Sequence, residues 1–346
     1  MDDLVVRAPL VWTGPGESMR LAAIACASGE LTYVGPAAAA PRAREYLRVD
    51  GFLMPAVADR HVHIALADPA AVVLGGVTAV RDLGWPADRI FGLAEASELV
   101  TYNGPLIRAA GPILTAPGGY PVGEAYAPPG YAREIEEPSQ AAVAVGELAE
   151  HGATAIKVSM NAEAPPTPDD GVLAEICRAA AEHAVPVTVH AQGGGQVERA
   201  IGAGVDELAH APFSERLSDQ VIQTLARETR IVSTLDLIRI HYGNEALRIA
   251  LDNLIRFREA GGVIVYGTDM GLPEWGLPLG INVREALLLR ETGMGHDEVL
   301  GAMVRGPLVP GAPADLIALA RDPREELESL AELTVVIRGG RVLLNR

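Results

Sequence analysis

The sequence has few cysteines, a deficit of positive charge and no long hydrophobic run. Two cysteines, Cys26 and Cys177, are too few for a disulfide framework, which favours a reducing compartment such as the cytoplasm. The formal net charge of −17 argues against nucleic acids and anionic membranes as partners. No stretch of about 18 consecutive apolar residues occurs, and the first residues do not resemble a signal peptide. We therefore expect a cytoplasmic protein that acts on a small molecule.

Lysine is almost absent, because 27 of the 28 lysine and arginine residues are arginine and Lys157 is the only lysine. It lies in the apolar run 153–158, which is typical of a buried strand, where a lysine is costly unless it has a partner or a task. Unlike arginine, a buried lysine can lose its proton and react, for example with CO₂ to give a carbamate. The alternative is that codon usage makes lysine rare and that Lys157 reaches solvent from a strand end.

Four of the eight histidines follow short strand-like runs. His61 and His63 form a His-x-His pair, and residues two apart in a strand point to the same side, so both imidazoles can reach one metal ion. Two further runs end in His190 and His210, and a third ends in Asp269. Each feature alone is weak, because a single histidine at a strand end is often a hydrogen-bonded core residue. The ordered set predicts a metal site.

Apolar runs and helical stretches alternate through the middle of the chain, which indicates a parallel (β/α)₈ barrel, or TIM barrel. The expected strands are 53–60, 77–82, 105–110, 154–159, 187–190, 206–209, 231–234 and 263–268. The expected helices are 86–99, 138–150, 170–184, 195–203, 216–228, 244–259 and 281–291. We predict an α/β fold in which residues 51–310 form the barrel. Residues 1–50 and 311–346, which are rich in short strands, would together form a small β-sandwich.

In such a barrel the candidate ligands lie toward the C-terminal ends of their strands, the face at which barrel enzymes carry their chemistry. The chain resembles the amidohydrolase superfamily at these positions, most closely its imidazolonepropionase-like and prolidase-like members. The matching motifs are His61-Val-His63, Ile156-Lys157-Val158, Val189-His190-Ala191, Ala209-His210-Ala211 and Gly267-Thr268-Asp269. The resemblance implies two divalent metal ions, usually zinc. His61, His63 and Asp269 would hold one, His190 and His210 the other, and Lys157, carboxylated by CO₂, would bridge them.

The resemblance further implies hydrolysis of an amide, lactam or cyclic imide-like C–N bond. Asp269 would act as general base and then as general acid. An N-acyl amino acid, a dipeptide and an imidazolone-like ring are candidate substrates, and an ester or lactone would suit the same chemistry. A mononuclear deaminase, a lyase or isomerase, and a catalytically silent scaffold remain alternatives. Deamination is disfavoured because Gln192 and glycines follow His190, where deaminases usually carry a glutamate. A homo-oligomer is compatible with the sequence.

The loops that follow the strands are expected to contact the substrate. Six residues are candidates, namely Tyr120, Gln192, Arg239, His241, Tyr242 and Trp275. Tyr120 stands where related enzymes often carry the histidine of Gly-Gly-His. The segment 111–137, rich in Gly, Pro and Tyr, is either a lid or pocket wall, or a packed loop without substrate contact. For Arg81 and Asp82, adjacent at the end of a strand, we expect a structural ion pair.

Overall fold

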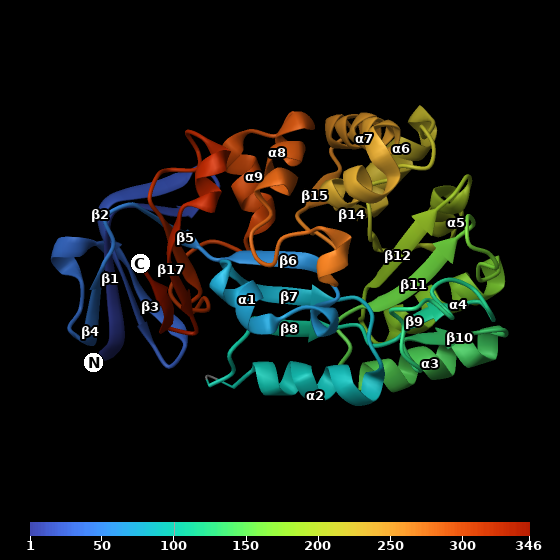
Figure 1. Ribbon diagram of the computed structural model, residues 1–346, viewed down its shortest axis with the longest axis horizontal. Helices are drawn as coiled ribbons and strands as arrows, with labels where there is room; N and C mark the ends of the chain where they lie inside the picture. The colour runs from blue at the N-terminus through green and yellow to red at the C-terminus, as the bar shows by residue number, and fades with distance from the viewer. Residues whose placement is uncertain (100) are drawn as a thin grey trace.

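Strands from both ends of the chain form one sheet, which lies beside a barrel of parallel strands (Figure 1). The computed structural model describes residues 1–99 and 101–346. The end sheet contains β1 (Asp2–Gly14), β2 (Glu17–Ala27), β3 (Glu30–Pro36), β4 (Ala43–Arg48), β5 (Phe52–Pro55), β16 (Leu316–Leu319), β17 (Leu333–Arg338) and β18 (Arg341–Asn345). Their order is β18-β17-β16-β5-β1-β2-β3, with β4 also paired to β1.

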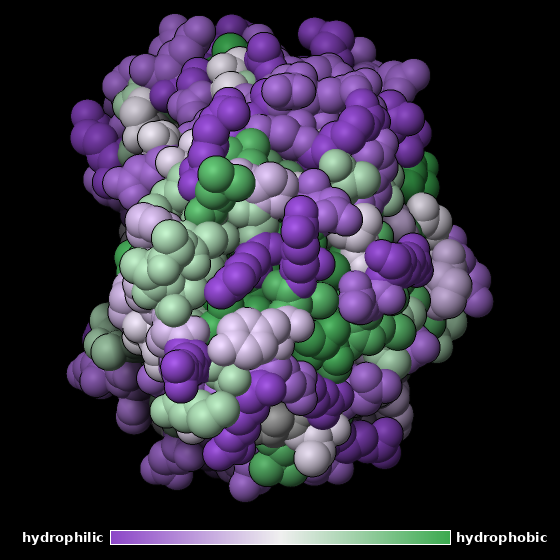
Figure 2. Space-filling model, turned by 90° about the vertical axis from the view of Figure 1, so that its left-hand side faces the viewer, coloured by the Kyte–Doolittle hydropathy of each residue, from purple (hydrophilic) through white to green (hydrophobic). Residues whose placement is uncertain are grey.

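The end sheet encloses its own hydrophobic core. Ile24 of β2 and Ile337 of β17 belong to one buried cluster although three strands separate them in the sheet, so the sheet folds over on itself. On the opposite face of the first strands, Val5 and Ala23 belong to a separate small cluster. Figure 2 views this end of the molecule, where hydrophobic residues gather among hydrophilic ones. Two segments far apart in sequence thus stabilise each other.

The barrel is built from parallel strands. They are β6 (Val57–Val62), β7 (Val77–Asp82), β8 (Leu106–Ala109) with its continuation β9 (Ile113–Thr115), β11 (Ile156–Asn161), β12 (Val187–Gln192), β13 (Glu207–Leu208), β14 (Arg230–Val232) and β15 (Val263–Val265); the short β10 (Ala132–Glu134) pairs with β9. The ring closes between β6 and the segment after β15, where His63 N donates to Met270 O at 2.8 Å. The expected barrel fold is confirmed.

Helices cover the outside of the barrel (Figure 1). They are α1 (Pro69–Leu74), α2 (Ala87–Ser97), α3 (Pro138–Glu150), α4 (Asp170–Glu182), α5 (Gln196–Ala203), α6 (Asp219–Glu228), α7 (Leu235–Glu259), α8 (Val283–Glu291) and α9 (His296–Met303). Side chains cap several of their first turns: Asp169 accepts a hydrogen bond from Val172 N in α4, as favoured N-cap residues do. Within the described residues, no helix is both long enough and apolar enough to cross a membrane.

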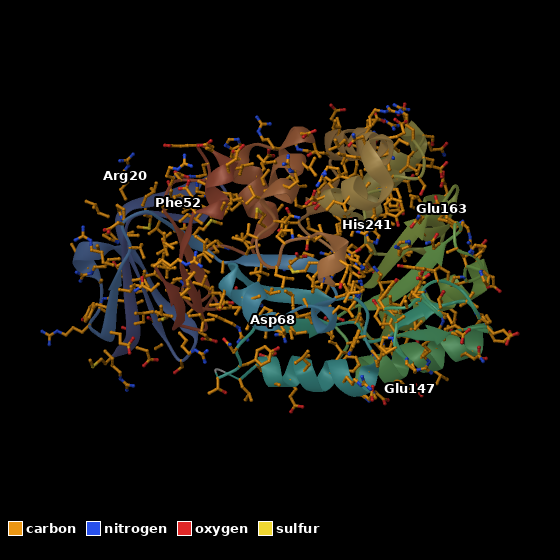
Figure 3. The ribbon with its side chains drawn as sticks, viewed as in Figure 1. Arg20, Phe52, Asp68, Glu147, Glu163 and His241 are labelled. Carbon is orange, nitrogen blue, oxygen red and sulfur yellow. The ribbon has the colours of Figure 1, made fainter. Side chains whose placement is uncertain are left out.

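The expected strand 53–60 is in fact two strands that belong to different sheets. Ala56 N donates to Asp315 O in the end sheet at 3.0 Å, whereas Val57 N donates to Gly76 O in the barrel at 3.2 Å. Phe52, labelled in Figure 3, contributes to the barrel's hydrophobic cluster, whereas its neighbour Leu53 contributes to that of the end sheet. The two cores therefore meet along β5.

The structure also differs from the prediction at the start of helix α7 and at Arg81 and Asp82. Helix α7 begins at Leu235 rather than at 244, and its first turns are separated from the rest by a kink at Gly243, where φ is 81°. The expected ion pair between Arg81 and Asp82 is wrong. Arg81 pairs with Glu207, whereas Asp82 accepts a hydrogen bond from Ile64 N at 2.8 Å. Adjacent residues in a strand point to opposite faces, so their side chains cannot meet.

We expect the Glu207 carboxylate to stabilise the barrel, and a Glu207→Gln substitution tests this contribution to stability. Glu207 is 2% exposed, contacts Arg81 and lies 3.2 Å from Arg230 Nε. Glu207→Gln removes the charge that compensates the half-buried Arg81 guanidinium, so we expect the free energy of unfolding in urea to fall by about 3–5 kcal/mol. Glu228→Gln, which removes an exposed carboxylate from α6, is the control and should change it by less than about 0.5 kcal/mol. Equal effects of the two substitutions would contradict the assignment.

Candidate metal centre

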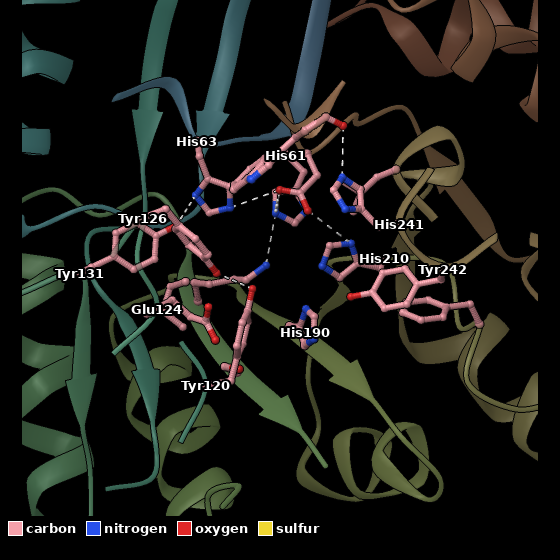
Figure 4. Close-up of a pocket in the computed structure, with 17 residues that line it drawn as sticks. His61, His63, Tyr120, Glu124, Tyr126, Tyr131, His190, His210, His241 and Tyr242 are labelled. Carbon is pink, nitrogen blue, oxygen red and sulfur yellow. Dashed lines mark hydrogen bonds and ion pairs between the residues drawn. The ribbon is translucent and has the colours of Figure 1, made fainter. Parts of the chain in front are cut away.

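Side chains from five barrel strands converge on one cavity (Figure 4). His61 lies on β6 and His63 directly after it, Lys157 lies on β11 and His190 on β12. His210 and Asp269 follow β13 and β15. All six line the same cavity, as strand-end residues of a parallel barrel are placed to do. The sequence pattern therefore identified residues that meet in space.

Asp269 lies at the centre of this group. Its Oδ1 atom is 3.2 Å from Nε2 of His61 and 3.2 Å from Nε2 of His63, and its Oδ2 atom is 4.0 Å from Nδ1 of His210. Lys157 Nζ lies 3.5 Å from His61 Nε2, and the rings of His190 and His210 are 4.8 Å apart. The potential ligand atoms of His61, His63 and Asp269 all lie within 4.8 Å of one another.

Hydrogen bonds fix which nitrogen each imidazole turns toward the cavity. His61 Nδ1 lies 2.9 Å from the carbonyl of Ala209, which can only accept, so Nδ1 carries the hydrogen and Nε2 presents a lone pair to Asp269. His63 Nδ1 lies 2.9 Å from the Tyr131 hydroxyl. His190 Nε2 donates to Gln192 Oε1 at 3.0 Å, so its Nδ1 carries the lone pair. Such outer partners orient metal-binding histidines.

Burial disfavours the charged forms of three histidines and of the lysine in this site. It lowers the pKa of His61 and His210 well below the usual value, and it lowers that of His190 to about 4. The positive charge of Lys157 contributes to each of these shifts. Burial also lowers the pKa of Lys157 itself to about 7. At neutral pH His61, His190 and His210 are therefore uncharged, and each keeps one nitrogen lone pair that can bind a metal ion.

A cation fits this arrangement. Oδ1 of Asp269 is buried and accepts no hydrogen bond within the described residues, although buried carboxylate oxygens normally have a partner. The two Nε2 lone pairs that face it at 3.2 Å repel it unless a positive charge lies between them. Imidazole nitrogens combined with a carboxylate suit zinc or a similar divalent ion. Asp269 also has a φ of 61°, a strained conformation that its N–H to His61 O bond of 2.7 Å holds.

Comparison with known proteins identifies the family. Residues 52–272 match the model of the amidohydrolase family. The chain belongs to the amidohydrolase family. An uncharacterised protein of Mycobacterium tuberculosis is 28% identical to this amidohydrolase over 342 residues, which cover 84% of this chain and 85% of the relative.

Solved structures share the fold of this amidohydrolase. The crystal structure of ochratoxinase from A. niger has a TM-score of 0.83 at 21% identity, covering 99% of this chain and 95% of that one. A Xaa-Pro dipeptidase with methionine bound in its active site has a TM-score of 0.82 at 20% identity, covering 99% and 100% of the two chains. The family match and the His-His-Asp group together identify a metal-binding hydrolase.

The residues expected to contact substrate divide into two groups. Tyr120, Tyr242, His241 and Trp275 line the cavity, whose volume is about 240 Å³. The other two lie outside its lining. Gln192 sits behind His190, where its Nε2 donates to Glu163 at 2.7 Å, and Arg239 pairs with Asp236 at 2.7 Å.

The sequence pattern did not predict five residues that line the cavity, namely Ile113, Glu124, Ser159, Phe213 and Leu237. Ser159 could have been found, because it lies two residues after Lys157 on β11 and so points to the same side. Glu124 belongs to the segment 111–137, which forms one wall of the cavity through Tyr120, Tyr126 and Tyr131. The other three residues are apolar, and nothing in the sequence distinguishes them from core residues.

The Tyr131 hydroxyl is expected to strengthen metal binding by orienting His63. Tyr131 is 1% exposed, and among the described residues the partner that remains for His63 Nδ1 without this hydroxyl is Gly84 O at 3.4 Å. We expect Tyr131→Phe to weaken zinc binding by about tenfold, the lower end of the range for such outer partners. Competition with a chromogenic chelator measures the affinity. Tyr102→Phe, which changes a tyrosine remote from the cavity, should leave it unaltered; the same affinity in both variants would exclude this role for Tyr131.

Proposed function

We propose that this protein is a binuclear, metal-dependent amidohydrolase that cleaves an amide, lactam or cyclic imide-like C–N bond of a small molecule. The observation that carries the proposal is the buried Asp269 carboxylate, which faces imidazole lone pairs and accepts no hydrogen bond at Oδ1 from the part of the chain that the structure describes. Family membership and the likeness to a Xaa-Pro dipeptidase support an amide as the scissile bond.

The ligands of the chain suffice for two divalent ions, for which zinc is the leading candidate. In this proposal His61, His63 and Asp269 hold one ion, and His190 and His210 hold the other. Lys157, once carboxylated on Nζ by CO₂, would supply oxygen ligands to both ions. When bound, such a pair polarises a substrate carbonyl and lowers the pKa of water. The central position of Lys157, 3.5 Å from His61 Nε2, supports the bridging role.

Asp269 is proposed as the proton carrier. As general base it accepts a proton from the attacking water, and as general acid it delivers the proton to the leaving nitrogen. Its backbone is anchored by the 2.7 Å hydrogen bond to His61 O, so the carboxylate keeps one orientation through both steps. Its Oδ2 atom, directed toward the His210 side of the cavity, is available to hold the proton.

A mononuclear deaminase is the weaker candidate. It would leave Lys157 without a task, and it would need a carboxylic acid beside the substrate ring to protonate it. The residue two positions after His190 is Gln192, an amide whose oxygen is already engaged by His190 Nε2 at 3.0 Å. Hydrolysis uses every residue of the group and is therefore favoured.

Metal content and a Lys157 variant test the binuclear site together. The wild-type protein, grown with zinc and bicarbonate, should contain about two divalent ions per chain, as a bridged pair requires. Lys157→Arg keeps a positive side chain of similar length but cannot form a carbamate, so it should lose essentially all activity and bind fewer ions while circular dichroism shows an intact fold. Arg248→Lys on the exposed surface is the control. An active Lys157→Arg variant, or one ion in the wild type, would refute the bridged pair.

Carboxylation of Lys157 should depend on pH in a defined direction. Only the neutral amine reacts with CO₂, and with a pKa of about 7 in the metal-free protein the neutral fraction rises from about 10% at pH 6 to about 90% at pH 8. We therefore expect reconstitution with zinc in bicarbonate, at fixed dissolved CO₂, to be about tenfold faster at pH 8 than at pH 6. The recovery of activity with time measures the rate. A lysine of ordinary pKa would remain more than 99% protonated at both pH values and would reconstitute far more slowly.

A further inference from the structure

The cavity above the metal ligands collects aromatic side chains from a chain that has few of them. The sequence contains 4 Phe, 3 Trp and 8 Tyr in 346 residues. Six of these residues line this one cavity: Tyr120, Tyr126, Tyr131, Phe213, Tyr242 and Trp275. None of the chain's 27 arginines lines it. The many aromatic rings and the lack of arginine in the lining together determine which ligands the cavity can bind.

The rings form continuous walls rather than isolated contacts (Figure 4). Tyr126 packs edge-on against Tyr131 at 5.8 Å and against Trp275 at 5.5 Å between ring centroids. Tyr120 joins this wall through a hydrogen bond of 2.6 Å between its hydroxyl and that of Tyr126. On the other side Phe213 and Tyr242 lie 4.4 Å apart. A group that enters the cavity therefore meets π-systems on two sides.

The charged side chains in the outer part of the cavity also favour a positively charged ligand. Glu124 is the remaining carboxylate in the lining; it is exposed, and no ion pair within the described residues engages it. The remaining basic side chain is His241, whose Nε2 lies 3.1 Å from the Trp275 carbonyl and therefore donates its hydrogen there. Lys157 belongs to the metal centre. The outer part of the cavity thus offers one negative charge and no permanent positive one.

These walls discriminate between charges. A substrate carboxylate would lose water without gaining an arginine or lysine partner, which is costly. An organic cation is attracted to the faces of Trp and Tyr rings, especially where it is shielded from water. It would also lie near the Glu124 carboxylate. The cavity should therefore bind a cationic group most tightly, a neutral group less tightly and an anionic group least tightly.

We infer that the substrate is an amide whose non-reacting end carries an organic cation, an ammonium or trimethylammonium group, held by this aromatic cage and Glu124. The inference rests on the proposed function and refines it. It excludes substrates with a free carboxylate at that end, so N-acyl amino acids and ordinary dipeptides are not substrates. A lactam or acyclic amide that carries a basic or quaternary amine fits.

Three isosteric ligands test the cage without any turnover. Phenyltrimethylammonium, tert-butylbenzene and benzenesulfonate have nearly the same shape but carry positive, zero and negative charge. In equilibrium dialysis against the metal-loaded protein, the cation should bind about tenfold more tightly than the neutral ligand, a ratio equal to ~1.4 kcal/mol and within the range for cation–π contacts. The sulfonate should bind least. Equal affinities for the cation and the neutral ligand, or tighter binding of the sulfonate, would overturn the inference.

Variants then locate the effect. Trp275→Leu keeps an apolar side chain but removes the ring, so it should abolish most of the tenfold preference while affinity for tert-butylbenzene changes less than threefold. Glu124→Gln should reduce the preference by about threefold. The control Glu228→Gln removes the same charge from the remote helix α6 and should leave all three affinities unchanged. An undiminished tenfold preference for the cation in Trp275→Leu would also overturn the cage.

Hydrolysis of three matched acetanilides, with para-trimethylammonium, tert-butyl or sulfonate groups, separates this inference from the proposed function. If the cation binds selectively but no amide is cleaved, the proposed function fails and the ligand class stands. If amides are cleaved with the neutral or anionic compound preferred in kcat/KM, the proposed function stands and the ligand class falls. Cleavage with the cationic anilide preferred supports both.

Discussion

The seam that closes the barrel is the interaction on which the rest of this structure depends. Asp269 N donates to His61 O at 2.7 Å, and His63 N donates to Met270 O at 2.8 Å. Beneath this seam the buried Asp59 carboxylate accepts hydrogen bonds from both strands, from His61 N at 3.0 Å and from Thr268 N at 3.0 Å. The same backbone bonds that complete the ring therefore align the His-x-His pair with the aspartate, so barrel closure and assembly of the site are a single event.

Lysine and aromatic residues are rare in this chain, and many of them lie at the candidate site. Its one lysine lies among the histidines, and six of its few aromatic residues surround the same cavity. The deep part of the cavity is suited to a metal-dependent reaction at a polar bond, because lone pairs face a carboxylate there. The outer part is lined largely by aromatic rings, and no arginine of the described residues lines it. Reaction and recognition thus occupy two zones of one cavity and can be altered separately by substitution.

The sequence was sufficient for the barrel and for the six candidate metal ligands that meet in the cavity, because strand periodicity and strand ends are local properties. It was insufficient where the outcome depends on distant partners. The apolar run around Ala56 gives no sign that the chain changes sheets there, since the hydrogen-bond partners, Asp315 and Gly76, lie on other segments. Likewise Arg81 finds Glu207, 126 residues away, and Arg239, close in sequence to Tyr242, turns to Asp236 instead of the cavity.

The shared end sheet has a consequence for how the protein is made. Strand β5 lies between β1, which is synthesised before it, and β16, which is synthesised after the whole barrel. At roughly 5–20 residues per second, the ribosome needs on the order of tens of seconds to reach β16 once β5 has emerged. During that time β5 presents an unpaired edge, the kind of surface on which nascent chains aggregate. Because β16 supplies the partner of this edge, loss of the short C-terminal segment removes a strand from the middle of the end sheet and not from its margin.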